Sequence, residues 1–208
     1  MISASFLSIK DNIKDNIKIL DNTSIDMLHV DIMDGVFVSN RTWDIDEVIY
    51  LLDGTNKIKD VHLMVSDVRM YVDDFKLLNP EYITFHYEAV DDILEMINYI
   101  KSLNIKVGLS IKPNTSVEVI KPYLKYLDLV LVMSVEPGMG GQKFINNSID
   151  KIEYLYNERI NNYYHYLIEV DGGINDQTSK MCSKADILVI GSFITNGNYQ
   201  VQIDKISI

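Results

Sequence analysis

The chain has 208 residues and a net charge of −11, because 30 Asp and Glu outnumber 19 Lys and Arg. Its 47% hydrophobic and 24% charged residues are ordinary for a globular protein and exclude disorder and collagen-like repetition. The negative field also argues against nucleic acid and anionic membranes as partners. At this length we expect a single domain over residues 1–208.

Three features of the sequence bear on location. No apolar run approaches the roughly 20 residues that a membrane span needs. The first ten residues, MISASFLSIK, lack the charged and apolar regions of a secretory signal. The only cysteine, Cys182, has no partner for an internal disulfide. Together these features predict a protein of a reducing compartment, the cytoplasm, with no membrane contact.

Short β-branched or apolar runs alternate along the chain with longer amphipathic runs. The expected strands are Ile2–Leu7, Met27–Ile32, Ile58–Met64, Tyr82–His86, Lys106–Ile111, Leu129–Met133, Tyr166–Val170 and Ile187–Ile190. The expected helices are Asp11–Leu20, Asp44–Leu52, Val68–Leu77, Asp91–Ser102, Ser116–Tyr123, Ser148–Arg159, Gln177–Cys182 and Tyr199–Lys205. Several helices begin with a residue type that caps helices, namely Asp44, Asp67, Asp91 and Ser116.

Eight strands that alternate with eight helices predict a parallel sheet with crossover helices. An open doubly wound sheet and a closed (β/α)8 barrel both fit this pattern. About 200 residues is the lower end of the range for the barrel, and eight near-regular units favour closure. The predicted fold class is therefore α/β, a single (β/α)8 TIM barrel.

Histidine and aspartate gather where predicted strands end, which is the functional face of both folds. His29 and Asp31 close the second strand, His62 closes the third and Asp171 closes the seventh. Because His29 and Asp31 are two residues apart, they point to the same side of a strand. Any one of these residues alone is more often a hydrogen-bonded strand end. The four together favour a site for a divalent cation: Zn, Fe(II), Mn or Co.

Glycine-rich segments follow each of the last three strands. They are Gly138, Met139, Gly140 and Gly141 after strand six, Gly172 and Gly173 after strand seven, and Gly191 and Ser192 after strand eight. One such segment alone usually marks a tight turn. The cluster predicts a phosphate site, because glycine lets backbone N–H groups approach an anion and late loops bind phosphate in such barrels. This cradle would let an acidic protein bind phosphate without a basic patch.

Three methionines, Met33, Met64 and Met133, end strands two, three and six. Methionine at such positions often serves as adaptable packing. The three side chains also suit an apolar wall that keeps water from a reactive intermediate. The sequence leaves both interpretations open.

Five segments, HVDIMDG, HLMV, VMSVEPGMGGQKF, EVDGGIN and VIGS, resemble the ribulose-phosphate 3-epimerase family in order and spacing. ASFLS resembles the first strand of the family, and GLSIKPNTSVE its fifth strand and loop. The similarity runs from about Ile2 to Ser192. The resemblance implies a (β/α)8 barrel that interconverts D-ribulose 5-phosphate and D-xylulose 5-phosphate in the pentose phosphate pathway.

The resemblance also implies roles for individual residues. His29, Asp31, His62 and Asp171 would hold the metal, and Asp31 and Asp171 would exchange the C3 proton through an enediolate. Ser5 and His62, together with the glycine segments, would bind the sugar phosphate. A homo-oligomer is expected.

Three further residues are expected to support this centre. His86 ends strand four and is expected to support the site rather than bind the metal, because four ligands are already assigned. Asp34 and Glu136 are expected to orient the ligands, as residues around a metal commonly do.

Two alternatives to the pentulose phosphate reaction remain. The segment VFVSNRTWD lacks the proline and glycine usual in the family, so Ser39–Asp44 leaves open a ketohexose 6-phosphate such as allulose 6-phosphate. A non-catalytic sugar-phosphate binding barrel would be expected to lose a ligand or an acid/base residue, and none is lost. Decarboxylases with similar barrels carry Asp-x-Lys-x-x-Asp on one strand, whereas residues 31–34 read Asp-Ile-Met-Asp, so they are set aside.

Overall fold

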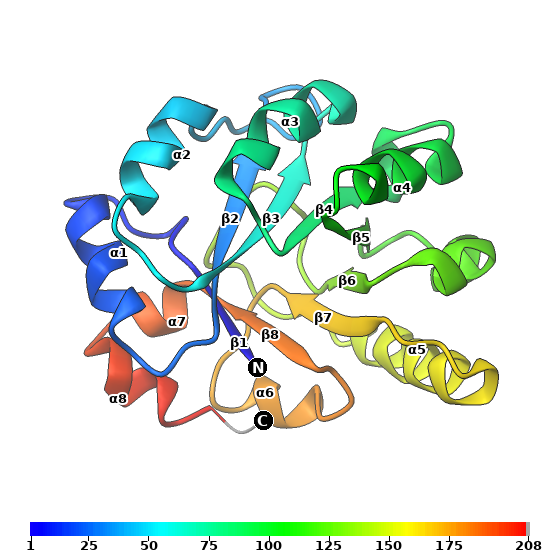
Figure 1. The fold of residues 1–208 in the computed structure, drawn as a ribbon. Coiled ribbons are helices and arrows are strands. Elements are labelled where there is room, and N and C mark those ends of the chain that lie inside the picture. The colour runs from blue at the N-terminus through cyan, green and yellow to red at the C-terminus, as the bar shows by residue number, and fades with distance from the viewer. Residues whose placement is uncertain (207–208) are drawn as a thin grey trace.

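The computed structural model describes residues 1–206. Its eight parallel strands are hydrogen-bonded in chain order, and the last strand pairs with the first to close a barrel. Helices surround the strands, as Figure 1 shows. This arrangement is the (β/α)8 barrel that the alternating pattern predicts.

The strands lie close to their predicted positions. They are β1 (Ile2–Ser5), β2 (Met27–Met33), β3 (Ile58–Met64), β4 (Tyr82–His86), β5 (Lys106–Ile111), β6 (Leu129–Met133), β7 (Leu167–Asp171) and β8 (Ile187–Ile190). β1 ends before the predicted Leu7, because the chain turns there and the Leu7 N–H donates to Ser5 Oγ at 3.3 Å. β7 is shifted by one residue from the predicted Tyr166–Val170, so Asp171 is its last residue.

The helices also follow the prediction, with differences at their ends. They are α1 (Ile13–Asp21), α2 (Ile45–Leu52), α3 (Val68–Phe75), α4 (Ile93–Ser102), α5 (Ser148–Asn162), α6 (Thr178–Met181), α7 (Ser192–Thr195) and α8 (Tyr199–Ile203), with 3-10 helices η1 (Lys76–Leu78), η2 (Tyr87–Ala89) and η3 (Val117–Tyr126). The short α7 is absent from the sequence prediction. η3 replaces the helix expected over Ser116–Tyr123, and it contains Pro122, which cannot donate a backbone hydrogen bond. Over residues 1–206, no helix is long and apolar enough to cross a bilayer.

Three of the four predicted caps accept a backbone hydrogen bond from the first turn of their helix. These residues are Asp44, Asp67 and Ser116. The prediction of Asp91 is wrong, because α4 begins one residue later than such a cap requires. Asp92 caps α4 instead and accepts from the Glu95 N–H at 3.0 Å.

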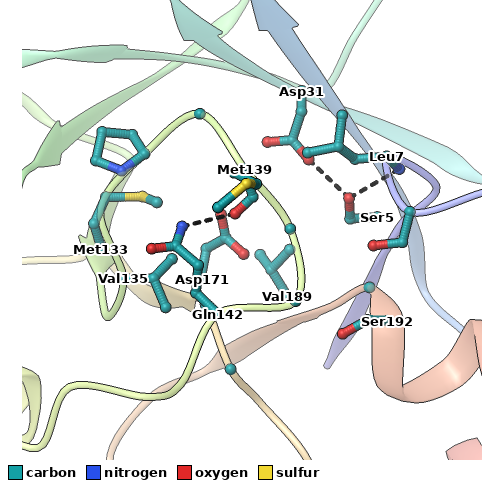
Figure 2. Close-up of a pocket in the computed structure, with 18 of the residues that line it drawn as sticks. Ser5, Leu7, Asp31, Met133, Val135, Met139, Gln142, Asp171, Val189 and Ser192 are labelled. Carbon is teal, nitrogen blue, oxygen red and sulfur yellow. Dashed lines mark hydrogen bonds between the residues drawn. The ribbon is translucent and has the colours of Figure 1, made fainter. Parts of the chain in front are cut away.

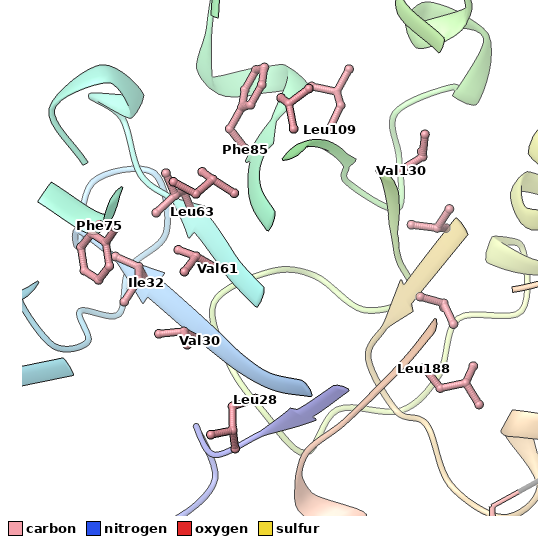
Figure 3. Packing of buried hydrophobic residues seen from close by; sticks show 14 of the residues in the cluster. Leu28, Val30, Ile32, Val61, Leu63, Phe75, Phe85, Leu109, Val130 and Leu188 are labelled. Atoms are coloured by element: carbon pink, nitrogen blue, oxygen red, sulfur yellow. The ribbon is translucent and has the colours of Figure 1, made fainter. Parts of the chain in front are cut away.

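Alternate residues of each strand face the helices and the barrel interior. On β2, Leu28, Val30 and Ile32 belong to the main apolar core, together with Phe75 of α3 (Figure 3). Burying one such side chain contributes roughly 1.5–3 kcal/mol. The shell between strands and helices therefore supplies most of the apolar stabilisation, and the interior is free to hold polar groups.

The register of the barrel brings polar side chains of neighbouring strands together. Asp31 of β2 pairs with His62 of β3, and Ser5 of β1 pairs with His29 of β2. All strands run parallel, so their carboxyl ends meet at one end of the barrel. The residues predicted to bind metal therefore converge there.

Candidate active site

Two histidines and two aspartates form a compact cluster at this end of the barrel. His29, Asp31, His62 and Asp171 each offer an atom that lies within 4.8 Å of the atoms offered by the other three. Asp31 Oδ1 lies 3.4 Å from His29 Nε2 and 3.2 Å from His62 Nδ1. Two imidazole nitrogens and two carboxylates are a donor set that suits Zn, Fe, Mn or Co.

The environment of His29 leaves one ring nitrogen free for a cation. His29 Nδ1 lies 2.6 Å from Asp60 Oδ2, which also accepts the Ser3 hydroxyl at 2.9 Å. Within the described chain, His29 Nε2 is buried and has no hydrogen-bond partner. A buried polar atom without a partner is costly, and metal-ligating histidines commonly bond a carboxylate through the other nitrogen. The cluster therefore fits a divalent metal.

His62 has a comparable contact on its far side. Its Nε2 lies 2.9 Å from His86 Nε2, while its Nδ1 faces Asp31. His86 is buried, and burial lowers its pKa to about 4, so its ring is neutral near pH 7. His86 thus contacts a member of the cluster without joining it, which agrees with its expected supporting place.

The two aspartates of the cluster differ in protonation. Burial acts to raise the pKa of Asp31, but the charge of the neighbouring His29 and the hydrogen bond with His62 outweigh burial and hold this pKa well below its usual range. Burial and the charge of Asp31 raise the pKa of Asp171 to about 6. One carboxyl group is therefore ionised while the other takes up a proton readily.

A further acidic side chain, Glu169, is fully buried in β7, two residues before Asp171. Burial and the charge of Asp60 raise the pKa of Glu169 well above its usual value. Glu169 forms a second cluster with His29 and Asp60, whose offered atoms also lie within 4.8 Å of one another. Asp60 is thus the ionised carboxylate that faces His29, and Glu169 holds a proton beneath it.

A pocket lies over the cluster (Figure 2), and its lining contains both aspartates of the cluster but neither of its histidines, His29 and His62. Its lining includes Ser5, Asp31, Asp171, Gly138, Met139, Gly140, Gly141, Gly172, Gly173, Gly191, Ser192, Met33, Met64 and Met133. The Ser5 hydroxyl donates to Asp31 Oδ2 at 2.7 Å. His62, also expected to contact substrate, is fully buried and is not among the lining residues. No lysine or arginine of residues 1–206 lines the pocket.

The turn after β7 requires glycine. Gly172 and Gly173 have φ angles of 120° and 65°, which side chains rarely allow. A Cβ on Gly173 would lie 2.5 Å from the Phe144 nitrogen, and a Cβ on Gly172 would lie 2.5 Å from Val135 Cγ2. Both glycines also line the pocket, so the backbone of this turn borders it directly.

The loop after β6 covers one side of the pocket and is fastened at several points. Gln142 Nε2 donates to the carbonyls of Glu136 and Met139 at 2.6 and 2.7 Å. Asn40, from the loop after β2, donates through Nδ2 to the Gly138 carbonyl at 2.7 Å. The two loops thus meet above the pocket.

The segment that departs from the family pattern closes back onto β2. Thr42 Oγ1 donates to the Asp31 carbonyl and accepts from the Met33 N–H, both at 2.9 Å. Trp43 packs against Phe6 with ring centroids 5.1 Å apart. The segment therefore braces the strand that carries two members of the cluster.

The expectation that Asp34 and Glu136 orient the metal ligands is wrong. Asp34 accepts hydrogen bonds from the Ser66 backbone and hydroxyl at 2.6 and 2.7 Å, which tie together the loops after β2 and β3. Glu136 accepts from Asn114 at 3.3 Å. Asp60 and His86 are the residues that contact His29 and His62 on the side away from Asp31.

The sequence model of the Ribulose-phosphate 3 epimerase family matches residues 1–195. The chain belongs to this family. A protein of Chlamydia pneumoniae named ribulose-phosphate 3-epimerase is 35% identical, over 91% of this chain and 84% of its own. One from Methanocaldococcus jannaschii with the same name is 40% identical, over 93% of this chain and 83% of its own.

A solved structure confirms the fold alone. The 3-hexulose-6-phosphate synthase from Salmonella typhimurium aligns with a TM-score of 0.66, over 99% of this chain and 95% of that chain, at 17% identity. The resemblance that the ordered motifs indicate is thus confirmed by the match to the epimerase family.

Two residues of the site, Asp60 and Glu169, escaped the sequence analysis. Asp60 lies two residues before His62, and Glu169 lies two residues before Asp171. Residues two apart on a strand share a face. The same spacing argument that joined His29 to Asp31 therefore contained the signal for both.

Proposed function

We propose that this single-domain barrel is a metal-dependent ribulose-phosphate 3-epimerase, which interconverts D-ribulose 5-phosphate and D-xylulose 5-phosphate. The observation that carries the proposal is a pair of carboxylates, the buried Asp31 and the partly buried Asp171, which border one pocket beside two histidines. Membership of the epimerase family supports this substrate.

A divalent ion, Zn, Fe(II), Mn or Co, would be held by His29, Asp31, His62 and Asp171. When bound, such an ion stabilises negative charge that develops on oxygen beside the reacting carbon. Asp60 and His86 keep the two imidazoles oriented toward it.

The proton transfer belongs to the two aspartates. Inversion at C3 needs one group to remove the proton and a second to return a proton on the opposite face. The low pKa of Asp31 and the pKa of about 6 of Asp171 suit a pair in which one carboxyl is a base and the other an acid. Because the two groups interact, their proton losses belong to the pair. The donation from Ser5 to Asp31 Oδ2 leaves the other oxygen of that carboxylate facing the histidines.

The phosphate of the substrate would bind the backbone N–H groups of the turns after β6, β7 and β8. No lysine or arginine in residues 1–206 lines the pocket, whereas Gly172, Gly173 and Gly191 expose their backbone there. The hydroxyl of Ser192 is available as a further donor. Anchoring the phosphate orients C3 between the two aspartates, which favours transfer.

The Met33, Met64 and Met133 side chains border the same pocket and present apolar surface to the sugar. In this proposal they keep bulk water from the enediolate, so that the two aspartates deliver the proton to C3.

The deciding experiment is epimerisation of ribulose 5-phosphate with solvent deuterium, before and after chelation and dialysis. Activity should vanish with the metal and return with Fe(II), Mn, Co or Zn, and deuterium should enter at C3. Full turnover in protein shown to be metal-free by elemental analysis would refute the metal requirement. Absence of turnover in loaded protein, with binding retained, would support a non-catalytic binding barrel.

Substrate size needs a separate comparison because the Ser39–Asp44 segment departs from the family. We expect higher kcat/KM for ribulose 5-phosphate than for allulose 6-phosphate. A reversed preference would assign the chain to the hexulose phosphate reaction.

Location and assembly complete the proposal. The only cysteine, Cys182, is buried and free, which suits the reducing cytoplasm. We propose a homo-oligomer, and light scattering after gel filtration would test it directly.

A further inference from the structure

His62 can bind a metal through Nδ1 only in one of its two neutral forms. Nδ1 faces the cluster, so it must carry the lone pair, and the ring hydrogen must be on Nε2. That hydrogen points to His86 Nε2, 2.9 Å away. The metal-binding form of His62 therefore requires His86 to accept at Nε2.

The position of the ring hydrogen on His86 depends in turn on an acidic residue. A neutral His86 that accepts at Nε2 carries its own hydrogen on Nδ1. Within residues 1–206, Nδ1 is buried without a hydrogen-bond partner, and the carboxylate oxygen Glu88 Oε2 faces it from η2 at 3.4 Å. A carboxylate cannot donate while ionised, so it selects the form of His86 in which Nδ1 holds the hydrogen.

Glu88 is held in place by its second oxygen. Oε1 accepts from the Lys112 backbone N–H at 2.9 Å and from the Thr115 hydroxyl. Both donors belong to the loop that follows β5. The carboxylate is therefore oriented by a segment outside the pocket.

That loop is in turn fixed by a buried lysine of α5. Lys151 is only 8% exposed, and its ammonium donates to the carbonyls of Lys112, Pro113 and Thr115 at 2.9, 2.7 and 2.7 Å. A lysine is rarely so buried, and all three of its hydrogens are used here. None of its contacts reaches the pocket, so the proposed reaction gives this residue no direct part.

We propose that Glu88 and Lys151 are positioning residues that fix the metal-binding form of His62 through His86. The contacts run from α5 to the loop after β5, then to Glu88, His86 and His62. The inference rests on the metal site of the proposed function. It extends that site outward by two residues that no motif of the sequence singles out.

Co²⁺ alone is the probe, because its visible absorption reports the ligands and its affinity can be measured without turnover. The variants are Glu88→Gln, Thr115→Val and Lys151→Met, and each is checked for thermal stability. Matched controls are Glu81→Gln and Lys121→Met, which break ion pairs with Lys106 and Glu158 on the surface. Thr115→Val removes only a hydroxyl donor and keeps the variant set informative if Lys151→Met does not fold.

Glu88→Gln should weaken Co²⁺ binding by roughly tenfold or more, the usual range for partners behind a ligand, and should alter the spectrum. Thr115→Val should weaken Co²⁺ binding by a smaller factor. Both control variants should keep a Co²⁺ affinity within about twofold of the unaltered protein. Glu88→Gln combined with Lys151→Met should lose less affinity than the product of the two single losses, since both act through the same contacts.

The outcomes separate this inference from the proposed function. If the unaltered protein does not bind Co²⁺, the metal site itself is refuted. If it binds Co²⁺ and folded Glu88→Gln keeps the same affinity and spectrum, only the positioning role is refuted. A fall in thermal stability without any change in Co²⁺ binding would likewise reduce these residues to packing.

Discussion

Gly191→Ala gives a direct test of whether backbone groups bind the substrate phosphate. Gly191 has φ −107° and ψ −96°, a ψ outside the α and β regions that alanine prefers, and an added Cβ would lie 3.6 Å from Ser5. The methyl group would therefore enter the pocket without displacing its walls. The protein should still fold with a loss of about 1–3 kcal/mol from this backbone conformation, whereas the phosphate should be pushed away from the N–H groups.

The expected loss follows from the strength of such contacts. A hydrogen bond to a charged group contributes about 1.5–3 kcal/mol, and each 1.4 kcal/mol is about tenfold in affinity. Losing one contact should raise KM for ribulose 5-phosphate by roughly 10- to 100-fold. Lys143→Ala, which removes an exposed cation beside the same loop, should change KM by less than about fivefold, since exposed charge pairs contribute about 0–1 kcal/mol.

Gly173→Ala is a useful contrast because it damages the scaffold as well. Its φ of 65° is unfavourable for alanine by about 1–2 kcal/mol, and its Cβ would lie 2.5 Å from the Phe144 nitrogen. At about 2–4 °C per kcal/mol for a chain of this size, Tm should fall by at least roughly 2–8 °C.

The assay combines steady-state kinetics with inhibition by inorganic phosphate, because KM equals a dissociation constant only when chemistry is slow. Gly191→Ala should raise both KM and the phosphate inhibition constant in protein that is still folded at the assay temperature. If Lys143→Ala weakens phosphate binding and Gly191→Ala does not, a side-chain cation holds the phosphate and the backbone account is refuted.

Three further outcomes are expected. Asp31→Asn and Asp171→Asn should each lower kcat by at least about two orders of magnitude, the usual scale for a positioned acid or base; a variant that keeps both its metal and its turnover would lose that role. Although Glu88 is partly buried, its hydrogen bonds lower its pKa from 4.5 to about 2. The unfolded chain then binds the proton first, so Tm should fall as pH drops from 4.5 toward 2, with a shallower slope in Glu88→Gln. Burial raises the pKa of Cys182 to about 11, so a thiol reagent at pH 8 should label it only after denaturation.

Much of the fold could be predicted from the sequence because strands and helices alternate regularly and begin with recognisable caps. The predicted helix ends are wrong where the local sequence is compatible with two structures. Asp91 and Asp92 are both good caps, and the start of α4 at Ile93 decides for Asp92. Pro122 interrupts a helical pattern, and this segment forms the 3-10 helix η3 instead of an α-helix.

The sequence predicts those residues of the site that lie at the ends of strands. His29, Asp31, His62 and Asp171 meet because parallel strands share one carboxyl end, which requires no detail of packing. Asp34 follows its strand in the same way, yet the loop turns its carboxylate toward Ser66. Loop conformation depends on contacts between distant segments, and spacing along the chain does not contain them.

The alternation along the barrel strands divides two kinds of selection between neighbouring residues. Along β2, the side chains of Leu28 and Val30 face the helices, whereas those of His29 and Asp31 belong to the cluster inside the barrel. A systematic substitution series along this strand should thus lower protein abundance at one set of positions and catalysis at the next, with a period of two. The residues that face the barrel interior can therefore change without a change in the residues that pack against the helices. A barrel of this kind can acquire a different reaction while its apolar core stays the same.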